Sequence, residues 1–266
     1  MDAKELIRAN RLTEARARLI EEVKGTPGDQ GKRTLLFQVL SFFGEWDKAD
    51  RHLDILAMGD ARADIGVQVY KNLIAAEKER EEVISGKRRP SFMATPPPYL
   101  DKYFIAWDML SSGKPAEAAA LYGEIEEESP EVAGKLDGKE FKGMRDTDQF
   151  LSGFLELFVH EHYLWMPFAS LREISIPEPK TLLDLIWIQG QITTWEGLTT
   201  GCYIPVLYPG SAAHENDLVR LGKMTDWKDL GEGFWKGMGQ HVFLIGDEEK
   251  AILDIREIQF TFTGEK

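Results

Sequence analysis

The residue types that could hold a metal ion gather around His160 and His162. Two histidines that are two positions apart fall on the same side of a β-strand, so their imidazoles could share one ion. Asp146 and Asp148 could add oxygen ligands, which makes a metal-dependent enzyme one alternative for this chain. Histidines beside aromatic residues more commonly form hydrogen bonds, however, and aspartates commonly cap helix N-termini. We favour these structural roles and assign no catalytic residue, metal or cofactor.

Two further features of the sequence indicate neither a cofactor site nor a catalytic nucleophile. The glycines of residues 231–237 lack the preceding strand, the third glycine at the right spacing and the later acid of a dinucleotide site, so they predict a turn. The single cysteine, Cys202, has no nucleophile signature around it, and no serine lies in a nucleophile-elbow pattern. We expect Cys202 to be a buried or half-buried structural thiol.

Aromatic residues are the remaining candidates for a functional role. Tyr163, Trp165, Tyr208 and Trp227 could form a patch that binds a partner protein, because aromatic anchors dominate the energetics of interfaces. The same residues fit a hydrophobic core, and we favour the core on residue type alone.

Composition limits the kinds of protein that this chain can be. Its 266 residues, 43% of them hydrophobic, suffice for one large domain or two ordinary ones. A net charge of -13 argues against nucleic acid or an anionic membrane surface as the main partner. No apolar run approaches the length of a membrane span, and the N-terminus predicts an amphipathic helix rather than a signal peptide. We therefore expect a cytoplasmic protein that does not insert into membranes.

A repeated motif organises the first part of the chain. The run Gly44–Ala49 has counterparts at residues 10–15 and 113–118, and the step from Ala15 to Ala49 is 34 residues, the tetratricopeptide period. We predict tetratricopeptide-like helical hairpins over residues 1–128, with a further helix over residues 64–82. The basic run at residues 87–89 follows that helix and is most simply a solvated helix end.

After Pro130 glycines become frequent and short extended runs replace the helical periodicity. We predict an α+β domain with an antiparallel sheet over residues 129–266. Hairpins are expected around Glu196-Gly197 and around residues 246–249, where the second strand would run from Ala251 to Phe262. The spacing of apolar residues between Phe150 and Phe158 predicts one more helix.

Several short fragments along the chain follow one another in an order that matches a known family. They are Phe43–Ala49, Tyr70–Arg80, Tyr163-x-Trp165-x-Pro167, Leu183–Trp187, Tyr208–Ser211, Thr225-Asp226-Trp227 and Gly237–Gln240. On these fragments the chain resembles the ImpE family, also called SciE or TagJ, accessory proteins of bacterial type VI secretion. Two departures stand out: residues 145–150 replace the family's aspartate-serine-arginine pattern, and His241 follows Gln240 where the family tends to have arginine.

The resemblance implies a non-enzymatic cytoplasmic adaptor that binds the small subunit of the contractile sheath, the ClpV-type ATPase that recycles it, or both. A groove of helical repeats usually receives a peptide or a helix. A general tetratricopeptide scaffold in another assembly is the other alternative. The candidate partner-binding residues combine signature residues with aromatic residues that the repeats would expose: Phe37, Trp46, Trp107, Tyr163, Trp165, Tyr208, Asp226, Trp227 and Gln240.

Overall fold

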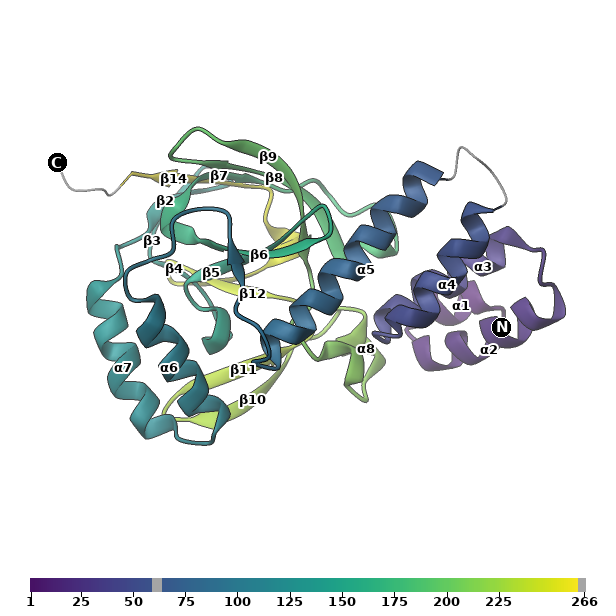
Figure 1. Cartoon of the computed structure of the whole chain (residues 1–266), viewed down its shortest axis with the longest axis horizontal. Helices are drawn as coiled ribbons and strands as arrows, with labels where there is room; N and C mark the ends of the chain where they lie inside the picture. The colour runs from purple at the N-terminus through teal and green to yellow at the C-terminus, as the bar shows by residue number, and fades with distance from the viewer. Residues whose placement is uncertain (59–63, 263–266) are drawn as a thin grey trace.

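The computed structural model describes residues 1–58 and 64–262, and it consists of an N-terminal set of helices followed by a part rich in antiparallel strands (Figure 1). This confirms the predicted two-part organisation. The described helices of the first part are α1 (Ala3–Arg8), α2 (Leu12–Gly25), α3 (Gln30–Phe42), α4 (Trp46–Ala57), α5 (Asp64–Ile84), α6 (Leu100–Ser111) and α7 (Pro115–Glu128).

Local sequence signals explain where these helices begin and end. Asp2 and Glu5 form a capping box at the start of α1, and Pro115 occupies the first turn of α7. Gly44 has a φ of 63°, the left-handed conformation that turns the chain between α3 and α4. Ala15 and Ala49 are fully buried where α2 and α4 pack against their neighbours. The helical hairpins are therefore present, while their tetratricopeptide character stays a prediction.

Most strands belong to one nine-stranded sheet with the order β1-β6-β5-β9-β8-β7-β14-β2-β3. All its pairs are antiparallel except β1 with β6. Its strands are β1 (Ser91–Phe92), β2 (Ala133–Leu136), β3 (Lys139–Lys142), β5 (Phe154–Val159), β6 (His162–Pro167), β7 (Leu171–Ser175), β8 (Trp187–Thr194), β9 (Thr199–Pro205) and β14 (Glu257–Thr261).

Two small sheets and several single turns complete the second part. The small sheets have the orders β13-β12-β4 and β10-β11. Their strands are β4 (Met144–Asp146), β10 (Asp226–Gly231), β11 (Phe234–Met238), β12 (Val242–Ile245) and β13 (Glu248–Ala251). The short helices are η1 (Gln149–Leu151), η2 (Phe168–Ser170), η3 (Leu183–Leu185), η4 (Ser211–Ala213), α8 (Asp217–Arg220) and η5 (Ile252–Asp254).

The structure confirms some of the predicted elements and corrects three of them. The hairpin of β8 and β9 turns at Glu196-Gly197 as expected. The helix predicted from Phe150 to Phe158 is wrong, because only η1 is helical and β5 follows it. Nearly every residue of β5 is buried, so its apolar residues do not alternate as those of a one-sided strand do.

The second correction concerns the last hairpin. The strand predicted over residues 251–262 is wrong, because β13 pairs with β12 and the chain then breaks at η5. After η5, β14 crosses to the large sheet, where it lies between β7 and β2. The hairpin partner is therefore only the four residues Glu248–Ala251.

The third correction concerns the glycine-containing run 231–237. The turn predicted over the whole run is wrong, because β10 ends at Gly231 and β11 begins at Phe234, so only Glu232 and Gly233 form the turn of this hairpin.

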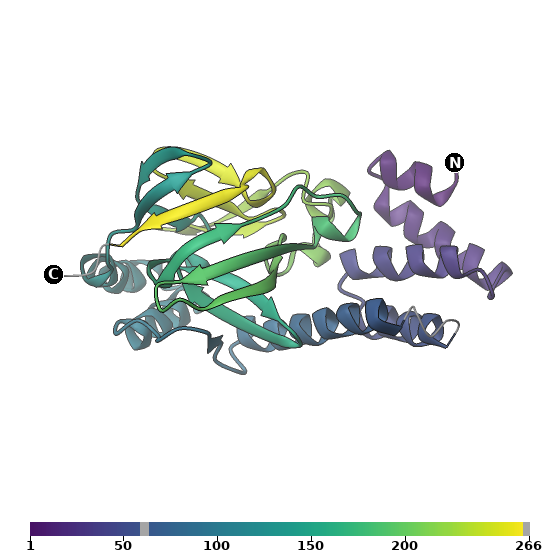
Figure 2. The same cartoon turned by 90° about the horizontal axis from the view of Figure 1, so that it is seen from above.

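The helices and the sheet share one hydrophobic core. Strand β1 comes from the helical part of the chain and pairs with β6, while α5 runs along the sheet and packs against α4 on its other side (Figures 1 and 2). The rings of Tyr103 on α6 and Phe154 on β5 lie 5.0 Å apart. The predicted division at residues 128/129 marks a change of secondary structure, and separate folding of the two parts stays a prediction. Among the described helices, none combines the length and apolar character needed to cross a bilayer.

Candidate functional site

Charged side chains of α5, most of them buried, bind three other elements. Glu77 accepts a hydrogen bond of 2.8 Å from the Trp187 indole on β8, and Glu81 accepts one of 2.7 Å from the Trp46 indole on α4. Glu79 accepts a hydrogen bond of 3.0 Å from the backbone N–H of Tyr163 on β6. Helix α5 therefore joins the N-terminal helices to the sheet through polar contacts as well as packing.

Arg80 forms the centre of a buried ion network. It is 4% exposed, and its Nε and Nη2 atoms donate to the two carboxylate oxygens of Glu156 at 2.8 and 2.5 Å. Nη2 also donates to the Leu207 carbonyl at 2.9 Å. Tyr163 donates its hydroxyl to Glu156. Burial would raise the pKa of Glu156, but Arg80 and His241 outweigh burial and lower it to about 2.

His241 extends this network to Asp146. Its Nδ1 lies 2.7 Å from Asp146 Oδ2, and its Nε2 lies 3.0 Å from Glu156 Oε2 as an ion pair without the alignment of a hydrogen bond. Burial would lower the pKa of His241, but the carboxylates of Asp146 and Glu156 raise it to about 9. The imidazole is therefore positively charged at neutral pH. A histidine can thus supply the charge at a position where the resemblance leads us to expect arginine.

Asp146 and Asp148 have different partners at the end of this network. Asp146 Oδ1 accepts a hydrogen bond of 2.6 Å from the Tyr208 hydroxyl. Asp148 accepts the backbone N–H groups of Phe150 and Gly237, both at 2.8 Å, and so caps η1. The capping role predicted for Asp148 is confirmed. Burial and the neighbouring Asp146 raise the pKa of Asp148 to about 7.

The structure does not assemble the alternative metal site. His160 lies in the turn between β5 and β6, and His162 is exposed on β6. Asp146 and Asp148 lie in the interior instead, where His241, Tyr208 and backbone groups are their partners. Within residues 1–58 and 64–262, no three His, Cys, Asp or Glu side chains are grouped as metal ligands would be.

The signature fragments of the second part are joined to one another and to neighbouring loops by hydrogen bonds. The Ser211 hydroxyl donates to the Tyr208 carbonyl at 2.6 Å and accepts the Gly239 N–H at 2.7 Å. Gln240 donates its side-chain amide to the Gly222 carbonyl at 2.6 Å and accepts the Leu253 N–H at 3.1 Å. These contacts hold loops together, so these signature residues have a structural role.

Six of the nine candidate partner-binding residues are buried. The exposure expected for Phe37, Trp46 and Trp107 is wrong, because their rings pack against Tyr70, Trp187 and Trp165. The favoured core role is confirmed for Tyr163, Trp165 and Tyr208.

Three candidate residues retain exposed surface. Trp227 is half-buried against Tyr208, and Gln240 is also half-buried. Asp226 is exposed, and His214 Nε2 lies 3.1 Å from its carboxylate. A role of these three residues in partner binding stays a prediction.

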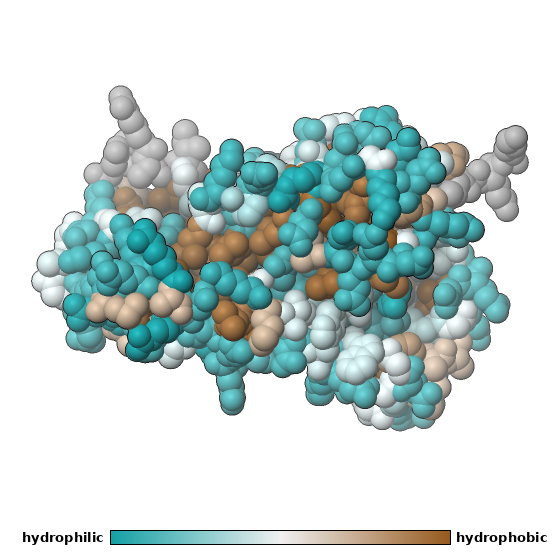
Figure 3. Space-filling view, turned by 180° about the vertical axis from the view of Figure 1, so that it is seen from behind, coloured by the Kyte–Doolittle hydropathy of each residue, from teal (hydrophilic) through white to brown (hydrophobic). Residues whose placement is uncertain are grey.

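A surface whose residues are not among the nine candidate partner-binding residues lies where the two parts meet. Burial raises the pKa of the half-buried Tyr70 on α5, and Tyr203 on β9 and Asp184 in η3 raise it further. We call Tyr70, Asp184 and Tyr203 the interlobe surface. Figure 3 shows apolar side chains gathered in a band that runs from the N-terminal helices across the strand-rich part. Such a band bordered by polar surface is typical of a protein-binding face.

Polar contacts fix the N-terminal helices beside this face. Asp217 at the start of α8 accepts the N–H and the hydroxyl of Thr13, both at 2.8 Å. Lys223 donates to the Asn10 side chain at 2.7 Å. The Arg220 guanidinium lies 4.7 Å from the centre of the Phe43 ring. The relative placement of the two parts therefore rests on side chains from both.

Comparisons with known proteins agree on one family. The family model described as "ImpE protein" matches residues 138–259. A relative from Pseudomonas aeruginosa, named "Type VI secretion system accessory component TagJ", is 32% identical over 260 residues, which cover 98% of this chain and 91% of the relative. A crystal structure of a protein from Vibrio parahaemolyticus has a TM-score of 0.86 at 22% identity and covers 97% of both chains, which shows the fold.

Proposed function

This chain belongs to the ImpE family of type VI secretion accessory components, and we propose that it is a non-enzymatic cytoplasmic adaptor. Its proposed partners are the small subunit of the contractile sheath, the ClpV-type ATPase that recycles the sheath, or both. The observation that carries the proposal is the similarity to TagJ along nearly the whole chain, which includes the helices as well as the strand-rich part.

The interlobe surface is our proposed contact for one partner. Paired helices of the tetratricopeptide kind bind peptides or helices through apolar anchors at helical spacing. The apolar band in Figure 3 offers such anchors. Tyr70 on α5 and Tyr203 on β9 add half-buried rings with hydroxyl groups. Tyrosine is favoured in interfaces because it buries a large ring at a low cost in conformational entropy.

Calorimetric titration of the full chain with each purified partner tests the proposal. The double variant Tyr70→Lys/Tyr203→Lys should weaken binding of at least one partner by tenfold or more, because two lysines would enter the contact. Leu198→Lys is the matched control, since Leu198 is a 47% exposed apolar residue in the turn between β8 and β9. Lack of binding to both partners would refute the adaptor role. Unchanged binding by the double variant would refute only the chosen surface.

A further inference from the structure

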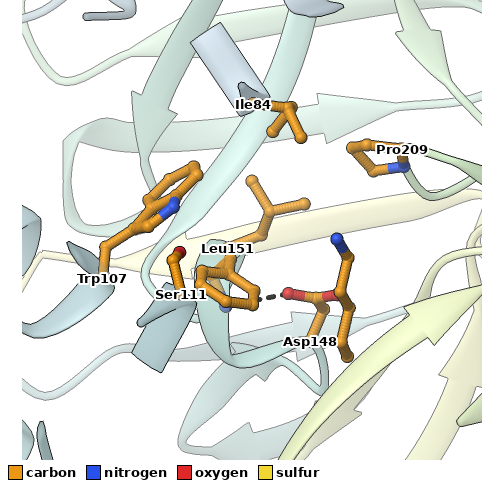
Figure 4. Close-up of a pocket in the computed structure, with 8 residues that line it drawn as sticks. Ile84, Trp107, Ser111, Asp148, Leu151 and Pro209 are labelled. Carbon is orange, nitrogen blue, oxygen red and sulfur yellow. Dashed lines mark hydrogen bonds between the residues drawn. The ribbon is translucent and has the colours of Figure 1, made fainter. Parts of the chain in front are cut away.

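A small cavity opens between α6, η1 and β11, away from the N-terminal helices (Figures 1 and 4). Its volume is about 50 Å³, so it takes the tip of a side chain rather than a whole residue. The walls combine apolar side chains with a buried acid, an exposed serine at the rim and a lysine. Trp107, Ser111, Asp148, Phe150 and Lys236 line the cavity.

The acid in this cavity lacks a cationic partner. Asp148 is 2% exposed, and each of its two carboxylate oxygens accepts one backbone N–H, from Phe150 and from Gly237. Among the described residues Asp146 pairs with His241, whereas Asp148 takes part in no ion pair. Burial and the neighbouring Asp146 raise the pKa of Asp148 to about 7, so a cation bound in the cavity would stabilise the ionised form of this acid.

The aromatic walls also favour a cation. The rings of Trp107 and Phe150 lie 5.1 Å apart, and the Lys236 ammonium lies 5.7 Å from the centre of the Phe150 ring. The chain's own lysine thus already places a positive group against this wall. Lys236 is half-buried on a flexible side chain, so it can move to solvent when a better-fitting cation arrives.

We propose that this cavity binds the guanidinium group of an arginine side chain presented by a partner protein. Asp148 would accept its N–H groups, and its plane would lie against the Phe150 ring, where Lys236 now places its ammonium. Arginine fits better than lysine because its planar, weakly hydrated head group both stacks and donates in two directions. The excess of acidic residues on the chain, 45 against 32 basic ones, favours a basic partner. This contact is separate from the interlobe surface and does not depend on it.

Titration of the full chain with small arginine analogues tests the inference directly. N-acetyl-arginine amide should produce a saturable shift of the Trp107 indole signal in the NMR spectrum. N-acetyl-citrulline amide has the same shape without the charge and should bind at least fivefold more weakly, as should N-acetyl-lysine amide. Lack of a saturable shift, or equal binding of citrulline, would overturn the proposal. Equal binding of lysine would overturn the choice of arginine.

Two variants locate the binding. Asp148→Asn should weaken the arginine analogue at least fivefold. Ser111→Trp should do the same by closing the rim, whereas Ser112→Trp, one position further on the exposed surface and outside the cavity, should leave binding unchanged. If Asp148→Asn fails to fold, the comparison of Ser111→Trp with Ser112→Trp decides whether the arginine analogue binds in this cavity. Binding by Ser111→Trp at the level of the unmodified chain would refute the assignment to this cavity.

Discussion

The replacement of His241 by glutamine tests whether its positive charge holds the buried network together. The imidazolium lies 2.7 Å from one oxygen of Asp146 and 3.0 Å from one oxygen of Glu156. Glutamine has a similar size and still donates a hydrogen bond, but it carries no charge. The variant therefore leaves two buried carboxylates without their shared cation, a change that destabilises folded proteins strongly.

The pKa of His241 sets the size and the pH range of the effect. The two carboxylates outweigh burial and raise this pKa from 6.5 to about 9. A histidine whose pKa is raised in the folded state contributes stability that is fully present below pH ~6.5 and is lost as the pH rises through about 9. At ~1.4 kcal/mol per pKa unit, the span from 6.5 to about 9 corresponds to roughly 3 kcal/mol.

Urea unfolding at several pH values between ~6 and ~10 measures this contribution. The difference in free energy of unfolding between the unmodified chain and His241→Gln should fall by about 3 kcal/mol between pH ~6 and pH ~10. Asp148 also titrates, but it is present in both proteins and largely cancels in the comparison. His241→Arg is the control, because its charge should persist across the range. Parallel pH curves for the unmodified chain and His241→Gln would refute the reasoning.

Three other perturbations have defined outcomes. In Gly237→Ala the new Cβ would lie 2.4 Å from the buried Tyr208 ring, so urea unfolding should show a loss of about 3 kcal/mol, whereas Gly201→Ala, which has open space, should change stability far less. Trp46→Phe removes an indole hydrogen bond of 2.7 Å to α5 and should cost about 1–2 kcal/mol in the same assay. Burial raises the pKa of Cys202 to about 12, so iodoacetamide at pH ~8 should modify it only after unfolding, as mass spectrometry would detect.

Local patterns predicted the elements whose determinants lie close together in the sequence. The helical hairpins follow from periodic apolar residues and from small residues such as Ala15 and Ala49 at the crossings. The β8–β9 hairpin follows from a glycine at residue 197 with a φ of 88°. The helix prediction for residues 150–158 was wrong because a strand that is buried on both faces shows no alternation of apolar and polar residues.

The candidate site depended on distant pairings that the sequence does not display. Arg80 and Glu156 are 76 positions apart, and nothing near either residue indicates the other. The sequence held one weak indication that charged residues of α5 are buried. Leu73, Glu77 and Arg80 lie at helical spacing on one face, so the buried stripe of α5 continues into its charged end. The candidate aromatic residues were buried because large rings supply most of the shared core between helices and sheet.

The position of α5 also shapes how the chain folds. Its partners are made long after it: Trp187 comes 110 positions after Glu77, and the Leu207 carbonyl comes 127 positions after Arg80. Contacts of such long sequence separation close large loops and form slowly. During synthesis α5 therefore leaves the ribosome with charged groups on its packing face and no surface to bury them against. A chain that ends before residue 241 lacks the cation between Asp146 and Glu156, so a larger fraction of it would be unfolded and open to proteolysis.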